Sequence, residues 1–146
     1  MPKVGLVGCV KTKRDSALPA KDLYVSGLFV GRRRFVERSC DSWWVLSAKH
    51  GILSPGQMIE PYDLALERMP ARSRYQWSLS VLESLDVQVE LIAGDVVEVH
   101  AGSAYRDFGL VDGLVQRGLT VEIPTFGLGL GQQLQFYKEA PHKIKE

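Results

Sequence analysis

Four short, valine-rich apolar runs, separated by segments with helical spacing, constrain the fold of this chain most. The runs are KVGLVGCV at 3–10, WWVLS at 43–47, VVEVH at 96–100 and TVEIP at 120–124. Such runs are typical of strands buried on both faces of a parallel sheet. Strands that alternate with helices predict a three-layer α/β fold, with helices on both faces of a small sheet of about four strands. Right-handed crossovers leave few strand orders, and we expect 2-1-3-4 within a single α/β domain over residues 1–146.

Helical periodicity and capping residues predict four helices between and after these strands. They cover about 28–38, 70–85, 104–117 and a segment from Gly131 to just before Pro141. We expect Ser26 and Ser103 to cap the first and third helices, because a serine hydroxyl can accept hydrogen bonds from the first free backbone N–H groups. Gly118 is expected to end the third helix, since glycine adopts the left-handed conformation readily.

Composition excludes several classes of protein. With 45% hydrophobic and 24% charged residues, the chain is neither disordered nor collagen-like. It lacks an apolar run long enough to span a bilayer, and its first residues do not resemble a signal peptide, so no membrane partner is expected. The two cysteines, Cys9 and Cys40, form no CxxC motif, which favours the reduced cytoplasm. Three histidines without ligand spacing predict no metal site, and no cofactor is expected.

The charges are unevenly distributed along the chain, although the net charge is only +1. Residues 1–38 contain nine basic and three acidic residues, and the basic ones include Arg32, Arg33, Arg34 and Arg38. This excess predicts an anionic partner, such as a nucleotide or nucleic acid. The alternative is that these charges lie on solvated helix faces.

Two loops after predicted strands offer groups that bind anions. The first loop follows the 3–10 strand and carries two lysines and a hydroxyl, which can hold a phosphate or a carboxylate. Its candidate binding residues are Cys9, Lys11, Thr12 and Lys13. The second loop has alternate glycines before a helix start, where free N–H groups can cradle an anion. Its candidates are Gly129, Gly131 and Gln132. The alternatives are a solvated basic turn and a loop that only caps its helix.

Acid/base chemistry is predicted for two further segments. Ser47, Lys49 and His50 follow the second strand, and histidine titrates closest to neutral pH. Residues 51–59 separate this segment from Glu60 and Asp63, two carboxylates that could activate water. The glycines and proline between the segments allow the chain to turn back, so we expect a carboxylate beside His50 that raises its pKa against the opposing effect of Lys49. The alternative is that these residues only form a structural loop.

Aromatic and small residues complete the candidate ligand site. Tyr62 and Tyr105 could stack on a base. His100 and Gly102 end the third strand, where small residues let a ligand approach the backbone. His100 could equally be a core histidine with its hydrogen bonds satisfied. Because the carboxyl ends of parallel strands meet at one edge, we expect all these motifs to line one pocket.

Taken together, four segments resemble a family of uncharacterised domains found in bacteria, archaea and phages. They are Cys9-Val10-Lys11-Thr12-Lys13, Asp22-Leu23-Tyr24, the Ser47-Ala48-Lys49-His50-Gly51 motif and Glu60-Pro61-Tyr62-Asp63-Leu64. In that family the first motif is usually near Cys-Ser-Lys-Thr-Lys, so Val10 departs from it. Residues 47–66 also resemble, more locally, the larger YaaA peroxide-stress proteins, which are described as DNA-binding. The resemblance implies an α/β fold and a connection with nucleotides or nucleic acids.

Two hypotheses of function follow. The first is an enzyme that acts on a nucleobase, nucleotide or nucleic acid, as an N-glycosidase or a base transferase, with a phosphate-binding pocket at the strand ends. The density of polar residues after predicted strands favours it. The second is a non-catalytic nucleic-acid-binding stress-response protein, which the arginine-rich segment would favour.

Overall fold

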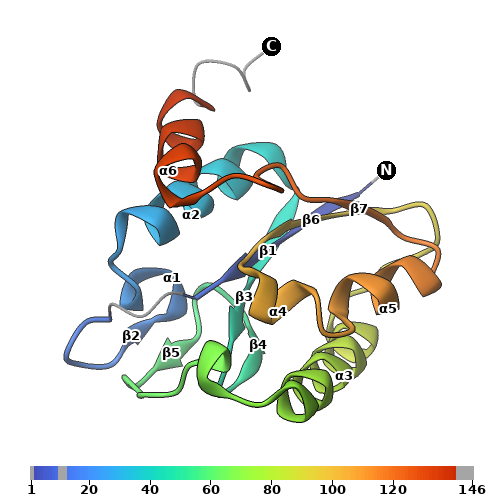
Figure 1. The fold of residues 1–146 in the computed structure, drawn as a ribbon, viewed down its shortest axis with the longest axis horizontal. Helices are drawn as coiled ribbons and strands as arrows, with labels where there is room; N and C mark the ends of the chain where they lie inside the picture. Colours follow the sequence, from blue (N-terminus) through green and yellow to red (C-terminus); the bar gives the residue numbers. More distant parts are fainter. Residues whose placement is uncertain (1, 10–12, 141–146) are drawn as a thin grey trace.

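A mixed five-stranded sheet forms the centre of the molecule (Figure 1). The structure is a computed structural model, and it describes residues 2–9 and 13–140. The strand order is β4-β3-β1-β6-β7, in which β4 alone is antiparallel to its neighbour. The strands comprise β1 (Lys3–Gly8), β3 (Ser42–Ser47), β4 (Gly51–Leu53), β6 (Val96–His100) and β7 (Thr120–Glu122).

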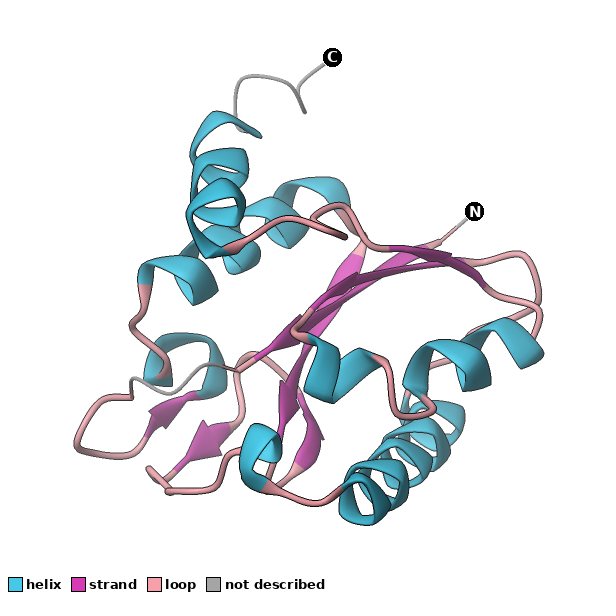
Figure 2. Cartoon of the chain, in the orientation of Figure 1, coloured by secondary structure: helices cyan, strands magenta, loops and turns pink. Residues whose placement is uncertain are grey.

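Helices cover both faces of this sheet (Figure 2). One face is covered by α2 (Gly27–Ser39) and α6 (Leu130–Glu139), which pack against each other. The opposite face is covered by α3 (Ala71–Gln88) and α5 (Leu110–Gln116). Shorter helical segments are α1 (Ala20–Leu23), the 3-10 turn η1 (Leu66–Arg68) and α4 (Ser103–Arg106).

The predicted strand order is confirmed. The four expected strands correspond to β1, β3, β6 and β7, and they lie side by side as β3-β1-β6-β7. The fifth strand, β4, occupies residues that we expected to be a loop. It forms because Gly51 adopts a left-handed φ of 75°, which turns the chain back along β3.

The predicted third helix is interrupted, which corrects the expectation of one helix over 104–117. It divides into α4 and α5 at Gly109, whose φ of 106° is incompatible with a continuous helix. Gly102, rather than Ser103, stands at the N-cap, and no side chain caps this helix. The other two expectations are met: the Ser26 hydroxyl accepts a hydrogen bond from Phe29 N at 3.2 Å, and Gly118 adopts a φ of 79° after α5.

A second, two-stranded sheet holds two long loops together beside the central sheet. It pairs β2 (Leu18–Pro19) antiparallel with β5 (Met58–Ile59). Lys13 also forms an isolated bridge with Tyr24. The β2–β5 pairing fixes the segment after β1 against the segment after β4, and the bridge closes a loop within the segment after β1. Among the described residues, no helix combines the length and the apolar character that crossing a membrane requires.

Close approach between α2 and α6 depends on a glycine. A Cβ added at Gly31 would lie 2.7 Å from Tyr137 Cβ, well inside van der Waals contact. Gly131, in the first turn of α6, has open space around it. Both are helical, so alanine favours the helix equally at the two positions, and only the contact with Tyr137 distinguishes them.

We expect Gly31→Ala to lower the free energy of unfolding by about 1–3 kcal/mol, the usual cost of overpacking. Gly131→Ala should instead raise it by about 0.4–1 kcal/mol, because alanine restricts the unfolded chain. Urea denaturation followed by circular dichroism measures both. Equal effects of the two substitutions would contradict the close packing of α2 on α6.

Candidate functional site

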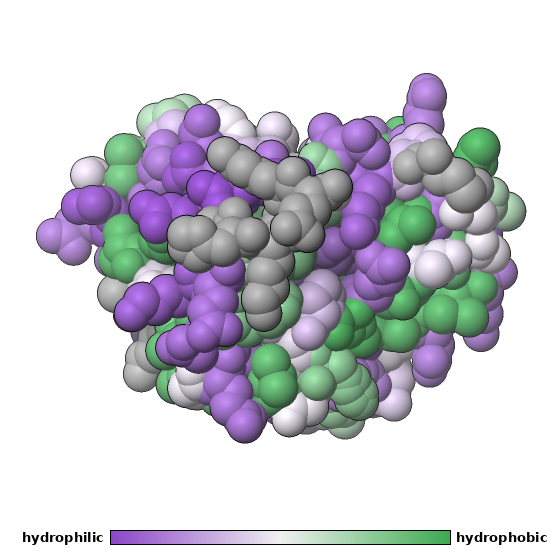
Figure 3. Space-filling view, turned by 90° about the horizontal axis from the view of Figure 1, so that it is seen from above, coloured by the Kyte–Doolittle hydropathy of each residue, from purple (hydrophilic) through white to green (hydrophobic). Residues whose placement is uncertain are grey.

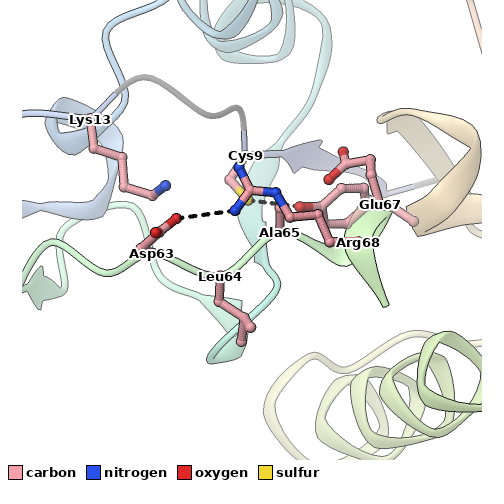
Figure 4. A pocket seen from close by; sticks show the side chains of 8 residues that line it. Cys9, Lys13, Asp63, Leu64, Ala65, Glu67 and Arg68 are labelled. Carbon is pink, nitrogen blue, oxygen red and sulfur yellow. Dashed lines mark hydrogen bonds and ion pairs between the residues drawn. The ribbon is translucent and has the colours of Figure 1, made fainter. Parts of the chain in front are cut away.

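A pocket of about 280 Å³ lies where β1 and β6 end (Figure 4). Cys9 enters it directly after β1, and Tyr105 enters from α4, which follows β6. Lys13 lines a further part of it. The remaining wall comes from the segment between β5 and α3, with Asp63, Leu64, Ala65, Glu67 and Arg68. The pocket therefore occupies the carboxyl edge of the sheet, where ligands of α/β proteins usually bind.

The hydroxyl of Tyr62 joins the elements around this pocket. It hydrogen-bonds to Tyr24 Oη at 2.6 Å and to Ser47 Oγ at 2.7 Å. It also donates to Cys9 Sγ at 3.7 Å, and Cys9 Sγ in turn contacts Tyr105 Oη at 3.2 Å. Five polar side chains from five separate segments thus form one connected group, which we call the Tyr62 cluster.

Ser47 is the fixed end of the Tyr62 cluster. It is fully buried at the end of β3, and its Oγ accepts a hydrogen bond from His50 N at 3.1 Å. Its carbonyl oxygen accepts from Trp77 Nε1 at 2.9 Å, which attaches α3 to the strand end. The ring of His50 lies edge-on to Tyr62, with 5.5 Å between the ring centroids.

Charges of both signs surround the mouth of the pocket. Lys13 Nζ lies 4.7 Å from the ring centroid of Tyr62 and 5.8 Å from that of Tyr24, which is within cation–π range. Arg68 forms an ion pair of 3.7 Å with Asp63, and both side chains are mostly exposed. Figure 4 shows Asp63, Arg68 and Glu67 arranged around the opening. The pocket therefore offers cations, carboxylates and an aromatic wall to one ligand.

Burial keeps the phenols of the Tyr62 cluster neutral. It raises the pKa of Tyr24, Tyr62 and Tyr105, and the nearby Cys9 sulfur raises each further. These hydroxyl groups therefore remain hydrogen-bond donors and acceptors at neutral pH.

The structure brings six of the sixteen predicted site residues to this edge of the sheet. Cys9, Lys13, Asp63 and Tyr105 line the pocket, and Ser47 and Tyr62 lie in the cluster behind it. Glu60 and Lys49 are exposed and do not belong to the lining described. Lys11 and Thr12 lie outside the described residues.

The expected pairing of His50 with a carboxylate is not found. Within residues 2–9 and 13–140, neither Glu60 nor Asp63 forms an ion pair with His50, and Asp63 pairs with Arg68 instead. The pKa of His50 lies below its ordinary value, first because of burial and then because of the adjacent Lys49 charge. Lys49 therefore lowers the pKa of His50 as expected, but neither Glu60 nor Asp63 lies where it would raise this pKa.

His100 does not line the pocket but lies on the other face of the sheet, beneath α6. It is completely buried, and its Nδ1 and Nε2 contact Tyr137 Oη at 2.6 Å and Glu98 Oε1 at 2.5 Å. Glu98 also accepts from Ser39 Oγ at 3.1 Å and pairs with Lys3 Nζ at 3.0 Å. Residues 98 and 100 point to the same face because side chains alternate along a strand. His100 is therefore a core histidine whose hydrogen bonds are satisfied, which was the alternative considered for it.

The glycine-rich loop before α6 is likewise absent from the pocket lining described. Gly129 is the N-cap of α6, and Gln132 Oε1 accepts a hydrogen bond from Gly129 N at 2.9 Å. Gln132 therefore caps its own helix. Gly131 and Gly102 are both exposed, each without a neighbour near its α-carbon. The expectation that all the motifs line one pocket is thus met only in part.

Sequence analysis missed Glu67 and Arg68, which line the pocket from η1. The only signal was their position four and five residues after Asp63, close enough for one short segment to bring all three to the same pocket. The arginine-rich patch also needs correction. Arg32 is buried with only 4% of its surface exposed, and Arg33 pairs with Asp22 at 2.9 Å and Glu37 at 3.2 Å.

The expectation that the chain belongs to an uncharacterised domain family is confirmed. A family described as a family of unknown function, DUF6884, matches residues 4–139, which include every strand of the central sheet except the first residue of β1. The chain belongs to this family. No curated protein matches the sequence significantly.

The Tyr62 cluster predicts a specific stability effect. Tyr62→Phe removes the hydroxyl shared by Tyr24 and Ser47, so we expect the free energy of unfolding to fall by about 1–2 kcal/mol. Tyr75→Phe is the matched control, since Tyr75 is 55% exposed, and its effect should stay within about 0.5 kcal/mol. Urea denaturation compares the two, and equal effects would argue against the cluster.

A pH effect follows from His100. Burial lowers its pKa despite the contact with Glu98, so the folded chain holds it neutral where the unfolded chain binds a proton. The contribution of His100 to the free energy of unfolding should therefore reach its full value above about pH 6.5. On acidification this free energy should fall, by at most about 1.4 kcal/mol per pH unit for one proton. Urea denaturation at pH 7.5 and 5.5 measures this loss, which should shrink in His100→Gln. An unchanged loss would assign it to other groups.

Proposed function

We propose that this protein is an enzyme that cleaves or exchanges the N-glycosidic bond of a nucleotide or nucleic acid. The observation that carries the proposal is the composition of the pocket at the carboxyl edge of the sheet. Two carboxylates, Asp63 and Glu67, and two cations, Lys13 and Arg68, surround an interior that contains Cys9 and Tyr105. An N-glycosidic substrate needs all three kinds of group: a surface for the base, cations for phosphate and a carboxylate near the sugar.

The size and polarity of the pocket fit a small, partly aromatic ligand. Its volume of about 280 Å³ lies near the lower end of the range for small-molecule sites, roughly 300–1,000 Å³. Tyr105 supplies an aromatic surface, and its contact with Cys9 fixes the position of its hydroxyl. Lys13 and Arg68 stand at the mouth, where they can meet a phosphate while the base enters.

The reaction needs one carboxylate for acid/base work. Water or an incoming base attacks the anomeric carbon, and the bond between this carbon and the base nitrogen breaks with its electron pair on the base. Asp63 or Glu67 takes the proton of the attacking nucleophile, and the leaving base is protonated by the other carboxyl group or by solvent. The same carboxylates stabilise the positive charge that develops on the sugar.

Two further observations fit an enzyme of the reduced cytoplasm that acts on nucleotides or nucleic acids. The segment over residues 47–66, which resembles the YaaA peroxide-stress proteins, contributes Ser47, Tyr62 and Asp63 to the pocket or to the cluster behind it. Both described cysteines, Cys9 and Cys40, are free thiols, which fits the reduced cytoplasm.

The second candidate, a non-catalytic nucleic-acid-binding protein, has less support. Of the arginines predicted to form its basic patch, Arg32 is buried and Arg33 forms ion pairs with two carboxylates. On the face seen in Figure 3, hydrophilic residues are interspersed with hydrophobic ones. This candidate predicts binding that falls steeply with salt and does not depend on Asp63 or Glu67.

Base release tests the proposal. Nucleosides, nucleotides and single- and double-stranded oligonucleotides are incubated with the protein, and free base is measured by chromatography. With the substrate found, we expect Asp63→Asn or Glu67→Gln to lower turnover by about 10²–10⁴-fold, the usual contribution of a general acid or base. Both side chains are exposed, so the melting temperature should change little.

Glu83→Gln is the matched control, because Glu83 is an exposed carboxylate on α3 that does not line the pocket. Its turnover should equal that of the unmodified protein. Full turnover in both pocket variants would remove these carboxylates from the mechanism. Salt-sensitive oligonucleotide binding without base release would favour the second candidate.

A further inference from the structure

Arg32 is a buried cation at the carboxyl end of the central strand. It lies on α2 directly before the partly exposed Arg33 and the exposed Arg34, yet only 4% of its own surface is accessible. Its Nη1 donates to the carbonyl oxygen of Gly8, the last residue of β1, at 3.2 Å. The guanidinium therefore points across the end of β1 and not into solvent, although Arg33 and Arg34 adjoin it in sequence.

This guanidinium has no carboxylate partner within residues 2–9 and 13–140. The buried carboxylate on this face, Glu98, is already held by Lys3, Ser39 and His100. The Nε of Arg32 is also buried without a hydrogen-bond partner among the described residues. A buried charge normally requires both a counter-charge and satisfied hydrogen bonds, so this arrangement is costly unless something else completes it.

The neighbours of Arg32 do not supply the counter-charge. The phenol of Tyr137 interacts with the guanidinium and that of Tyr105 lies near enough to influence its pKa, but burial raises the pKa of both phenols, so they are neutral at pH 7. The Cys9 thiol is a third neighbour. Cys9 and Tyr105 are also walls of the pocket, so the charge of Arg32, held at Gly8 beside Cys9, acts on two residues that a ligand would meet, although Arg32 itself is not among the lining residues described.

We propose that Arg32 binds a phosphate group of the ligand at the carboxyl end of β1. This inference rests on the proposed function and extends it, because it names the buried phosphate-binding residue of the same site. A guanidinium presents a planar fork of N–H donors that matches two phosphate oxygens, and Nε belongs to that fork. The phosphate would supply the missing acceptor and the missing negative charge together.

A structural role for Arg32 predicts the opposite effect on folding. If the side chain only held the strand end, its removal would destabilise the free protein. If Arg32 instead binds phosphate, then Arg32→Met removes a buried charge that has no counter-charge in the free protein and keeps most of the apolar stem. Replacing a buried charge in this way is often neutral or stabilising. The stability of the unliganded variant therefore separates the two roles.

Thermal unfolding with inorganic phosphate tests the proposal. We expect phosphate to raise the melting temperature of the unmodified protein in a saturable manner, at constant ionic strength. The shift should disappear in Arg32→Met and persist in Arg34→Met, the matched control on the exposed side of α2. In Arg32→Lys, which keeps the charge but loses the fork, the apparent Kd should rise about tenfold to a hundredfold.

Three outcomes would overturn the inference. One is an equal phosphate shift in the unmodified protein and in both Arg32 variants. The second is a melting temperature of unliganded Arg32→Met well below that of Arg34→Met. The third is a phosphate shift that appears only in Cys9→Ser, because the Cys9 side chain would then be the partner that keeps phosphate from Arg32. None of these measurements requires turnover, so a failed base-release assay leaves this test intact, and the reverse also holds.

Discussion

Strand β1 is the element on which the rest of the structure depends, because its backbone is paired along both edges. Residues 4–8 pair with 42–46 of β3, and residues 3–7 pair with 96–100 of β6, in parallel on each side. This double pairing aligns the ends of three strands at one edge of the sheet. Gly5 adds a second constraint, since a Cβ there would lie 2.7 Å from Val36 Cγ1, and so its absence lets α2 pack closely on the strand.

The chemistry of the pocket follows from that alignment. Cys9 continues β1 and its N–H donates to Leu46 O at 3.0 Å, so the thiol is held beside the end of β3. Ser47 then lies one residue beyond Leu46, and Tyr62 reaches back to it from the following loop. The small β2–β5 sheet keeps this loop in place. Tyr62, which lies in a loop, thus becomes the centre of a hydrogen-bonded cluster.

The central sheet could be predicted from sequence because its signals are local. Valine-rich runs and helical spacing identify strands and helices, and the handedness of crossovers then leaves few orders. β4 could not be predicted, because three residues carry too little periodicity and the strand depends on the turn at Gly51. The break between α4 and α5 was missed for a similar reason: it rests on the backbone conformation of Gly109.

The candidate site was predicted less completely, because it depends on which way side chains point. Cys9, Lys13, Asp63 and Tyr105 follow predicted strands or the next loop, and they do converge. His100 also ends a strand, but its side chain faces α6, since alternation along β6 places it on the same face as Glu98. A run of arginines predicts a basic surface, and only the packing of α2 on β1 turns one of them inward.

Arg32 influences two groups of polar side chains, the buried network around His100 and the Tyr62 cluster. It interacts with Tyr137, which contacts His100, and its charge also acts on Cys9 and Tyr105, which line the pocket. The charge of Arg32 is one of the factors that lower the pKa of His100, after burial has had the largest effect. An anion that neutralised Arg32 would weaken this repulsion and raise the pKa of His100. By linkage, protonation of His100 would then strengthen anion binding, so the buried network beneath α6 and the pocket at the strand ends would titrate as one system.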